Sequence, residues 1–164
     1  MLTPDDLQAY LTANQIPAEI IHLAAETPTV PAAAEALGVS VDQIGKTVIF
    51  FVDSQPHAVI ANGTRRVDPR KLAQRFGVNR KKVKLADGAA VTNLTGYAPG
   101  TVPPFGHRED LPVLMDPSVR EQEIIYVGGG GIAALLRIRS DDLARITRAE
   151  LVMVLEDQLP ESSA

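Results

Sequence analysis

A lysine at the start of the most apolar segment of the chain is placed to do chemistry. Gly45, Lys46 and Thr47 lead directly into Val48–Val52, which contains no charged residue. An ammonium group beside such a segment is partly withdrawn from water, which suits it to bind a phosphate or to polarise a carbonyl. The alternative is a lysine that extends its ammonium group to solvent from the end of a strand.

Four consecutive glycines, Gly128–Gly131, leave a stretch of backbone without side chains. They formally match the dinucleotide-binding pattern Gly-x-Gly-x-x-Ala, but the next segment, 134–139, has the pattern of a strand rather than of a crossover helix. The bare N–H groups of Gly128, Gly129 and Gly130 could instead approach an oxyanion, a ribose or a phosphate closely. A wide bulge at a corner of a sheet is the alternative.

A loop rich in glycine and proline extends from Gly96 to His107. It contains three glycines and three prolines, and their tight turns and fixed φ angles make the loop rigid. Long rigid loops often shape a binding site. The alternative is a structural connection between two parts of a sheet.

The residue types of several common active sites are missing or dispersed. The chain has no cysteine, which excludes disulfides, thiol nucleophiles and thiolate metal sites. Its three histidines, His22, His57 and His107, are scattered and form no His-Glu-x-x-His motif, so we expect no metal and no cofactor. None of the six serines lies in a Gly-x-Ser-x-Gly motif, and spacing alone indicates no acid–base pair.

Nine of the 16 basic residues lie between Arg65 and Lys84, where Asp68 is the only acidic residue. This window has a net charge of +8, and the rest of the chain, −4 − 8, has −12. One basic surface on an acidic protein is typical of a protein that binds the phosphate backbone of a nucleic acid. The alternative is a pair of helices whose basic side chains are simply solvated. The residues that we assign to nucleic-acid binding are Arg65, Arg66, Lys71, Lys81, Lys82 and Lys84.

Capping residues and apolar patterns predict the elements that position these segments. Strands are expected at 19–23, 47–52, 57–61, 112–115, 123–127, 133–139 and 151–155. Helices are expected at 4–14, 31–38, 68–77 and 141–147, with short helices after Asn79 and Asp87 and a capping box at Ser118 and Glu121. Strands and helices alternate without a regular βαβ repeat, which favours the α+β class with a mixed sheet.

The length of 164 residues fits one domain, which we expect over 1–158, followed by a flexible C-terminal tail at 159–164. No run of 18 uncharged apolar residues occurs, so we expect no membrane partner. The first residues lack the basic and apolar regions of a signal peptide. We therefore expect a cytoplasmic protein.

Several short motifs, in their order along the chain, resemble the YbaK/EbsC family, the stand-alone relatives of the editing domain inserted in prolyl-tRNA synthetases. The resemblance covers about residues 20–155. Its motifs are Ala34-x-x-Leu37-Gly38, Gly45-Lys46-Thr47-Val48, Val59-x-Ala61-x-Gly63, Asp68-x-x-Lys71-Leu72-Ala73, Gly96-Tyr97-x-x-Gly100-x-x-x-Pro104-x-Gly106, Asp116 and Asp142-Leu143.

The resemblance implies a single domain with a strongly twisted, barrel-like mixed sheet surrounded by helices. It implies hydrolysis of the ester of a mischarged aminoacyl-tRNA in trans, with water or a substrate hydroxyl as the attacking group and Lys46 as the key polar residue. Its partners would be the acceptor end of the tRNA and an aminoacyl-tRNA synthetase. The residues that it places around the substrate are Thr47, Gly100, Pro104, Phe105, Gly106, His107 and Asp116. The rival interpretation is a non-catalytic tRNA-binding or synthetase-associated module.

Two positions depart from the pattern of the family. Relatives within synthetases carry a functional histidine just beyond the glycines, where this chain has Ile132-Ala133-Ala134. Relatives that edit cysteinyl-tRNA carry a serine before the glycines, where this chain has Val127. The sequence therefore leaves open which amino acid is removed.

Overall fold

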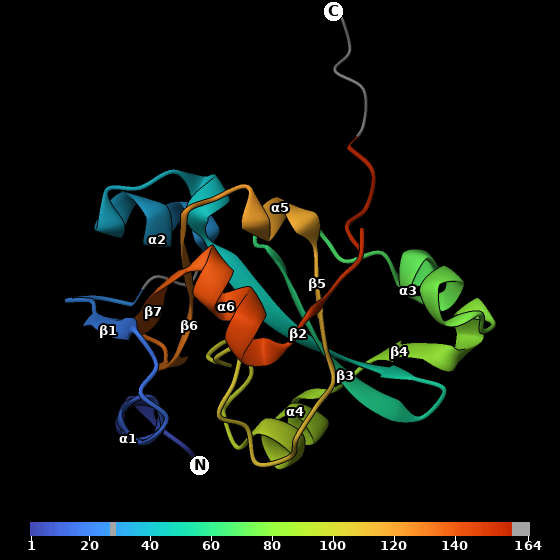
Figure 1. The fold of residues 1–164 in the computed structure, drawn as a ribbon, viewed down its shortest axis with the longest axis horizontal. Helices are drawn as coiled ribbons and strands as arrows, with labels where there is room; N and C mark the ends of the chain where they lie inside the picture. Colours follow the sequence, from blue (N-terminus) through green and yellow to red (C-terminus); the bar gives the residue numbers. More distant parts are fainter. Residues whose placement is uncertain (27–28, 159–164) are drawn as a thin grey trace, which may run out of the picture.

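Two β-sheets with helices packed around them form the described part of this computed structural model, residues 1–26 and 29–158 (Figure 1). The first sheet has the strand order β1-β7-β6, with β1 at Ala18–His22, β6 at Ile124–Gly131 and β7 at Ala134–Arg139. The second has the order β4-β2-β3-β5-β8, with β2 at Gly45–Val52, β3 at Gln55–Asn62, β4 at Val83–Leu85, β5 at Val113–Met115 and β8 at Glu150–Leu151. The predicted tail at 159–164 lies outside the described residues.

The two sheets meet at the beginning of β2. Ile44, just before β2, forms a parallel bridge with Tyr126 of β6, whereas the far end of the same strand pairs with β4 through Phe50 and Leu85. One edge of β2 therefore faces β6 at its start and β4 at its end. The second sheet is mixed, because β3 pairs with β5 and β5 with β8 in parallel. The predicted α+β fold with a twisted mixed sheet is confirmed, although the strands do not close into a barrel.

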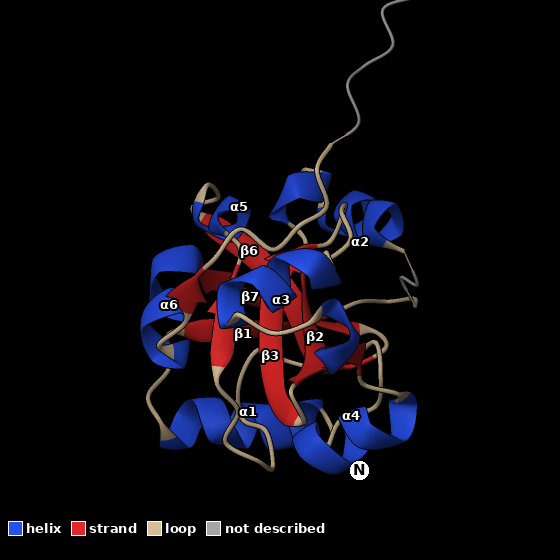
Figure 2. Ribbon diagram, turned by 90° about the vertical axis from the view of Figure 1, so that its right-hand side faces the viewer, coloured by secondary structure: helices blue, strands red, loops and turns tan. Residues whose placement is uncertain are grey.

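Helices surround the strands in both views (Figure 2). The α-helices of the described residues are α1 (Pro4–Ala13), α2 (Val30–Leu37), α3 (Pro69–Phe76), α4 (Gly88–Thr95), α5 (Pro117–Arg120) and α6 (Ser140–Thr147), and the 3₁₀ helices are η1 (Val41–Gln43) and η2 (Arg80–Lys82). Capping chemistry sets the ends of α3 as predicted: the Asp68 carboxylate accepts from the Arg70 N–H at its start, and Gly77 ends it with a φ of 64°.

The predicted capping box at Ser118 and Glu121 is wrong. The N-cap of α5 is Asp116, whose carboxylate accepts a hydrogen bond from the Ser118 N–H at 3.0 Å, and Pro117 occupies the first helical position. The Ser118 hydroxyl has no hydrogen-bond partner in the described structure. An aspartate followed by proline is the stronger helix start, because the proline φ is already helical and its missing N–H costs nothing there.

Several strands differ from the prediction in detail. β6, expected at 123–127, extends through the glycines to Gly131. The β2–β3 turn contains only Asp53 and Ser54, both with positive φ, while 55–56 already belong to β3. The strand expected at 151–155 is the two-residue β8 followed by an isolated bridge between Leu155 and Val67. The sequence does not predict β4, because its three residues are too few for their alternation to indicate a strand.

Side chains from both sheets form the main core. Ile49 and Ile60 of the second sheet pack in one cluster with Ile125 and Leu136 of the first, and each of them is at most 2% exposed. A second cluster fills the space beneath α3 and includes the buried Leu72. These packed faces hold the start of β2 against β6, where the site described below lies.

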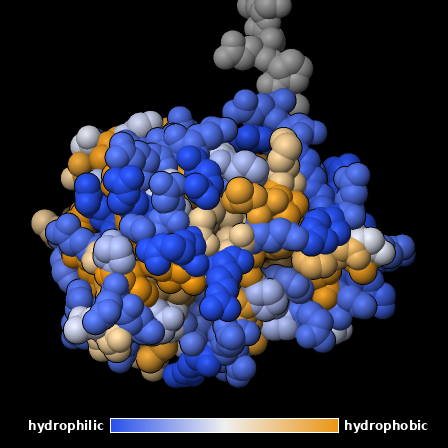
Figure 3. Space-filling model, in the orientation of Figure 1, coloured by the Kyte–Doolittle hydropathy of each residue, from blue (hydrophilic) through white to orange (hydrophobic). Residues whose placement is uncertain are grey.

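The face drawn in Figure 3 is mainly hydrophilic, with apolar side chains in separate patches. No helix of the described residues is long and apolar enough to cross a membrane.

Candidate active site

A pocket of about 180 Å³ lies where the start of β2 approaches β6. It brings together Lys46, Thr47, Gly100 and Gly128, which come from β2, from the loop after α4 and from β6. Thr29 stands at its margin, and its apolar walls are formed by Val30, Ala33, Ile44, Val102 and Leu135. Three segments that the sequence analysis singled out separately therefore meet at one pocket.

Lys46 is the one ionisable side chain that lines this pocket among the described residues. Its Nζ donates a hydrogen bond to the carbonyl oxygen of Arg65 at 2.8 Å, so the ammonium group is held rather than extended into solvent. Burial lowers the pKa of the Lys46 amine below its usual value, and the positive charge of Arg66 lowers it further. Lys46, at the start of the apolar strand β2, is thus a positioned and partly desolvated cation.

The hydroxyl of Thr47 is buried and has no hydrogen-bond partner in the described structure. Leaving a buried hydroxyl unpaired costs about 1–3 kcal/mol, so such groups are usually satisfied by protein, water or ligand. Thr47 also lines the pocket beside Lys46. It is therefore available to contact a polar group of a substrate.

The glycine run lies within β6 and fits closely against neighbouring backbone. A Cβ at Gly128 would overlap the carbonyl oxygen of Val102, and one at Gly129 would lie 2.7 Å from that of Ala134. Gly130 has a φ of 89°, and its N–H donates to the carbonyl oxygen of Thr101 at 2.9 Å. Gly128 borders the pocket, whereas the Gly130 N–H is already bonded within the protein. Close packing, with a register shift between β6 and β7, accounts for much of the run.

Gly130→Val should therefore lower stability more than activity. A side chain at this positive φ is strained by about 1–3 kcal/mol, and its Cβ would lie 3.0 Å from the Tyr97 ring. We expect the melting temperature to fall by several degrees, with any activity of the Lys46 pocket retained per folded molecule. Thermal denaturation and single-turnover assays on the same variant measure both effects. An unchanged melting temperature with lost activity would instead assign the Gly130 backbone to the substrate.

The end of the glycine–proline loop lies at a different pocket, of about 220 Å³, beside α1. Pro104, Phe105, Gly106 and His107 line it, and the Phe105 ring stacks on Tyr10 with 5.8 Å between the ring centroids. The structure thus divides the predicted substrate loop, because only its Gly100 end reaches Lys46. Proximity along the chain could not indicate this division.

His107 has a partner within its own loop. Its Nε2 lies 2.6 Å from the carbonyl oxygen of Pro103. Burial lowers the pKa of His107, and this backbone contact opposes the effect only in part. His107 is therefore a largely neutral side chain away from the Lys46 pocket.

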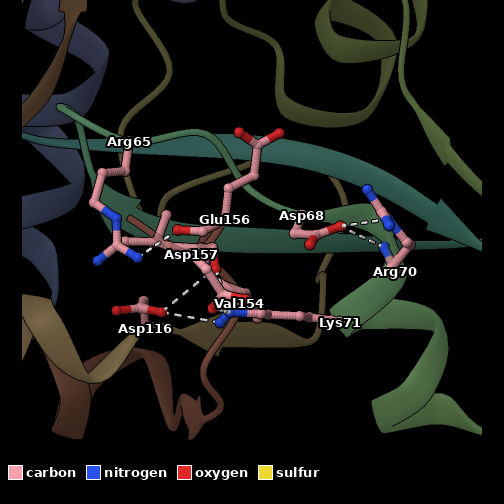
Figure 4. Close-up of polar contacts among 9 residues, drawn as sticks. Arg65, Asp68, Arg70, Lys71, Asp116, Val154, Glu156 and Asp157 are labelled. Carbon is pink, nitrogen blue, oxygen red and sulfur yellow. Dashed lines mark hydrogen bonds and ion pairs between the residues drawn. The ribbon is translucent and has the colours of Figure 1, made fainter. Parts of the chain in front are cut away.

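Asp116 is 6% exposed and also lies outside the Lys46 pocket. Besides the Ser118 N–H, its carboxylate accepts hydrogen bonds from the N–H groups of Val154 (2.9 Å) and Leu155 (3.4 Å) (Figure 4). Burial alone would raise the pKa of Asp116, but these hydrogen bonds outweigh it and lower the pKa. In this arrangement the carboxylate fixes the C-terminal segment.

Two of the predicted nucleic-acid-binding residues hold the same segment. Arg65 donates to the carbonyl oxygen of Glu156, and the Lys71 ammonium group contacts the Leu155 carbonyl oxygen at 2.6 Å and the Asp157 carboxylate at 2.7 Å (Figure 4). These partners lie more than 80 residues away along the chain, so local charge counting could not reveal them.

The remaining basic residues stay accessible. Arg66 is exposed, and so are Lys81, Lys82 and Lys84. The three lysines lie around a surface hollow that Phe51 and Ser54 of the β2–β3 hairpin also line. The basic window is therefore divided into cations held within the protein, Arg65 and Lys71, and accessible ones, Arg66 and the lysine surface at 81–84.

The sequence analysis missed the walls of the pocket. Val30 and Ala33 come from α2, a helix whose only charged residue is Glu35. The low content of charged residues in this eight-residue helix is the signal that could have indicated that one of its faces lines a pocket.

Comparison with known proteins gives a consistent picture. A family model described as an aminoacyl-tRNA editing domain matches residues 24–146. An uncharacterised protein, YwhH, of Bacillus subtilis (strain 168) is 26% identical over 130 residues, which are 79% of this chain and 81% of that protein. A proline–tRNA ligase of Staphylococcus aureus (strain Newman) is 34% identical over 106 residues, 63% of this chain but only 18% of the ligase.

Two solved structures share almost the whole fold. One, described as a candidate trans-editing enzyme for prolyl tRNA synthetase, has a TM-score of 0.87 and 28% identity, with 94% of this chain and 97% of that chain covered. The other, hypothetical protein APE2540, has a TM-score of 0.84 and 29% identity, with 92% and 99% covered. The family match extends over most of the chain and includes Lys46, Gly100 and Gly128. The chain belongs to the aminoacyl-tRNA editing domain family.

Proposed function

We propose that this protein hydrolyses the ester bond of mischarged aminoacyl-tRNA in trans. The observation that carries the proposal is a held, partly desolvated Lys46 in a small pocket with apolar walls, in a chain of the editing family. Hydrolysis by a second site has a clear physical purpose, because a synthetase separates substrates that differ by one methylene by only about 10–200-fold. A small pocket beside a cation suits a short aminoacyl group esterified to a terminal ribose.

The side chains of the pocket have distinct roles in this proposal. The Lys46 ammonium group holds the ester carbonyl or the terminal phosphate and stabilises negative charge as it develops. The Thr47 hydroxyl supplies a second polar contact, and the backbone at Gly128 borders the reacting ester. Gly100, Val30 and Ala33 limit the size of the amino-acid side chain.

Water is the attacking group in the hydrolysis. Attack by the neighbouring ribose hydroxyl would move the aminoacyl group to that hydroxyl, and water would then have to cleave the new ester. With water, its oxygen bonds to the ester carbonyl carbon, the bond from that carbon to the ribose oxygen breaks, and the ribose oxygen takes up a proton. The products are the free amino acid and tRNA with a free terminal hydroxyl. No protein nucleophile is required by this scheme.

The lysine surface at 81–84 would bind the acceptor stem in this proposal. Lys84 pairs across the sheet with Phe51, five residues along β2 from Lys46. At about 3.3 Å per residue this separation is about 17 Å, a span that a few nucleotides of an acceptor end can bridge.

A panel of mischarged tRNAs tests the proposal directly. The protein is incubated with each aminoacyl-tRNA, and both the remaining ester and the affinity are measured. Loss of the ester from at least one member above the spontaneous rate supports the deacylase. Tight binding without loss from any member would favour a non-catalytic tRNA-binding module.

Replacing Arg66 should shift the pH dependence of deacylation. If the protonated Lys46 amine is the active form, the rate falls as pH rises through its pKa, which burial and Arg66 lower. Arg66→Gln removes the repulsive charge, so the pKa of Lys46 rises and the falling limb moves to higher pH. Single-turnover rates on an aminoacyl ester of adenosine, corrected for spontaneous hydrolysis, measure the limb without a contribution from tRNA binding.

Arg70→Gln is the matched control for this prediction, because Arg70 is an exposed arginine of the same window whose ion pair is with Asp68. Its falling limb should coincide with that of the wild type. A limb that stays in place in Arg66→Gln would contradict the assignment of the titration to Lys46.

A further inference from the structure

A buried amide organises the chain between β3 and α3. Asn62, the last residue of β3, is 7% exposed. Its Oδ1 accepts hydrogen bonds from the Thr64 N–H at 2.9 Å and from the Thr64 hydroxyl at 2.7 Å, and its Nδ2 donates to the carbonyl oxygen of Asp42 at 3.3 Å. An asparagine that bonds the backbone two residues ahead in this way defines a turn.

This turn carries the acceptor that holds Lys46. The carbonyl oxygen of Arg65, directly after the turn, receives the Lys46 hydrogen bond at 2.8 Å. The turn is itself fixed to the start of β2, since the Gly63 N–H donates to the carbonyl oxygen of Ile44 at 2.8 Å and Asn62 pairs with Gly45.

Hydrogen bonds beyond the turn complete the support. The carbonyl oxygen of Arg66 accepts from the Glu156 N–H at 2.8 Å, and the Asp68 N–H donates to the Val154 carbonyl oxygen at 2.6 Å. The backbone at 65–66 is therefore held on one side by the turn and on the other by the C-terminal segment. Of these supports, Asn62 is the one made by a buried side chain next to Lys46.

We propose that Asn62 is a positioning residue, which holds the Arg65 carbonyl oxygen in place and through it fixes the Lys46 ammonium group in the pocket. Asn62 does not line that pocket, so it acts through the turn rather than on the substrate. The proposed effect on the position of Lys46 follows from the geometry alone. Its effect on deacylation rests on the proposed function.

Competitive acylation of the folded protein with acetic anhydride tests the position of Lys46 directly, with the extent of modification at Lys46 measured by peptide mass spectrometry. Asn62→Ala removes the Oδ1 acceptor and loosens the turn, which weakens the hydrogen bond between Lys46 and the Arg65 carbonyl oxygen. Lys46 should then react about two- to tenfold faster, the factor expected when one such hydrogen bond is lost. Asn62→Asp keeps that acceptor and should return the rate to the wild-type value or below, since an added negative charge favours the unreactive ammonium form.

Two further variants control for folding. Ser140→Ala removes a hydrogen bond of another buried side chain, to the Gln122 carbonyl oxygen, outside the Lys46 pocket, and should leave Lys46 labelling unchanged. Thr64→Val removes one of the two hydrogen bonds to Oδ1 at an exposed position and should give a smaller increase than Asn62→Ala. It decides the outcome if Asn62→Ala does not fold.

Wild-type labelling in folded Asn62→Ala, or in Thr64→Val when Asn62→Ala is unfolded, would overturn the proposal. Deacylation measured on the same variants separates it from the proposed function. Faster labelling with a reduced kcat and an unchanged KM supports both. Faster labelling with unchanged deacylation upholds the positioning role of Asn62 and removes Lys46 from the chemistry.

Discussion

Lys46→Ala should lower the single-turnover rate of deacylation about 10–150-fold while the protein stays folded. The estimate follows from the loss of one charge-assisted contact, worth about 1.5–3 kcal/mol, to the ester or phosphate of the substrate. The fold should tolerate the change, because the Lys46 side chain is only partly buried and, among the described residues, makes a single hydrogen bond, to the Arg65 carbonyl oxygen.

Two control variants accompany this measurement. Lys46→Met keeps the apolar stem of the side chain and should lose as much activity as Lys46→Ala if the charge is responsible. Arg70→Ala removes an exposed charge from the same window and should retain the wild-type rate. Melting temperatures confirm that each variant is folded. A wild-type rate in folded Lys46→Ala would exclude Lys46 from the reaction.

Local signals were sufficient to predict most of the helices. Asp68 followed by proline and then Gly77 marks both ends of α3, and the same chemistry places α1, α2 and α4. The prediction is wrong at α5, where Asp116 and not Ser118 caps the helix. Both residues are good caps. The proline after Asp116 favours it locally, and its tertiary contacts with Val154 and Leu155 add to this preference.

The sequence predicts which segments contribute to the candidate site, but not how these segments are arranged around the pocket. Lys46 and Thr47 are recognisable because a cation and a hydroxyl precede an apolar strand. That Gly100 reaches the same pocket while His107 does not depends on how the loop packs between β6 and α1. The glycines also required the structure, since a Cβ at Gly128 is excluded by the Val102 carbonyl oxygen, far away in sequence.

The basic window illustrates the same limit for charges. Its net charge of +8 predicts a phosphate-binding surface. In the structure, however, Arg65 and Lys71 hold the C-terminal segment and Arg75 pairs with Glu150. These contacts join residues 75–91 positions apart. Sequence spacing gives the charge of such a window, and only the fold separates its structural cations from those that remain accessible.

Replacing Lys81, Lys82 and Lys84 with glutamine should weaken tRNA binding by about two orders of magnitude at 0.15 M salt and flatten its salt dependence. Each lost phosphate contact removes about 0.7–0.9 from the slope of log affinity against log salt, so three contacts remove about 2–3 units. The loss should be the same for every aminoacyl group, because phosphate contacts carry no identity. Affinities measured between 50 and 300 mM salt, roughly the range over which such slopes are resolved, give both quantities.

A triple variant of Arg137, Arg139 and Arg145 to glutamine provides the matched control. It removes the same charge from exposed positions on β7 and α6, and β7 and β4 lie at opposite ends of the view in Figure 1. If only total charge matters, both triple variants lose affinity equally. If the lysine surface binds the acceptor stem, the control keeps most of the wild-type slope, and the lysine variant still deacylates an aminoacyl ester of adenosine at the wild-type rate. If the lysine variant keeps the wild-type slope of log affinity against log salt, the 81–84 surface is only solvated and does not bind tRNA. Arg66, the exposed arginine beside Lys46, would then be the next candidate for the tRNA contact.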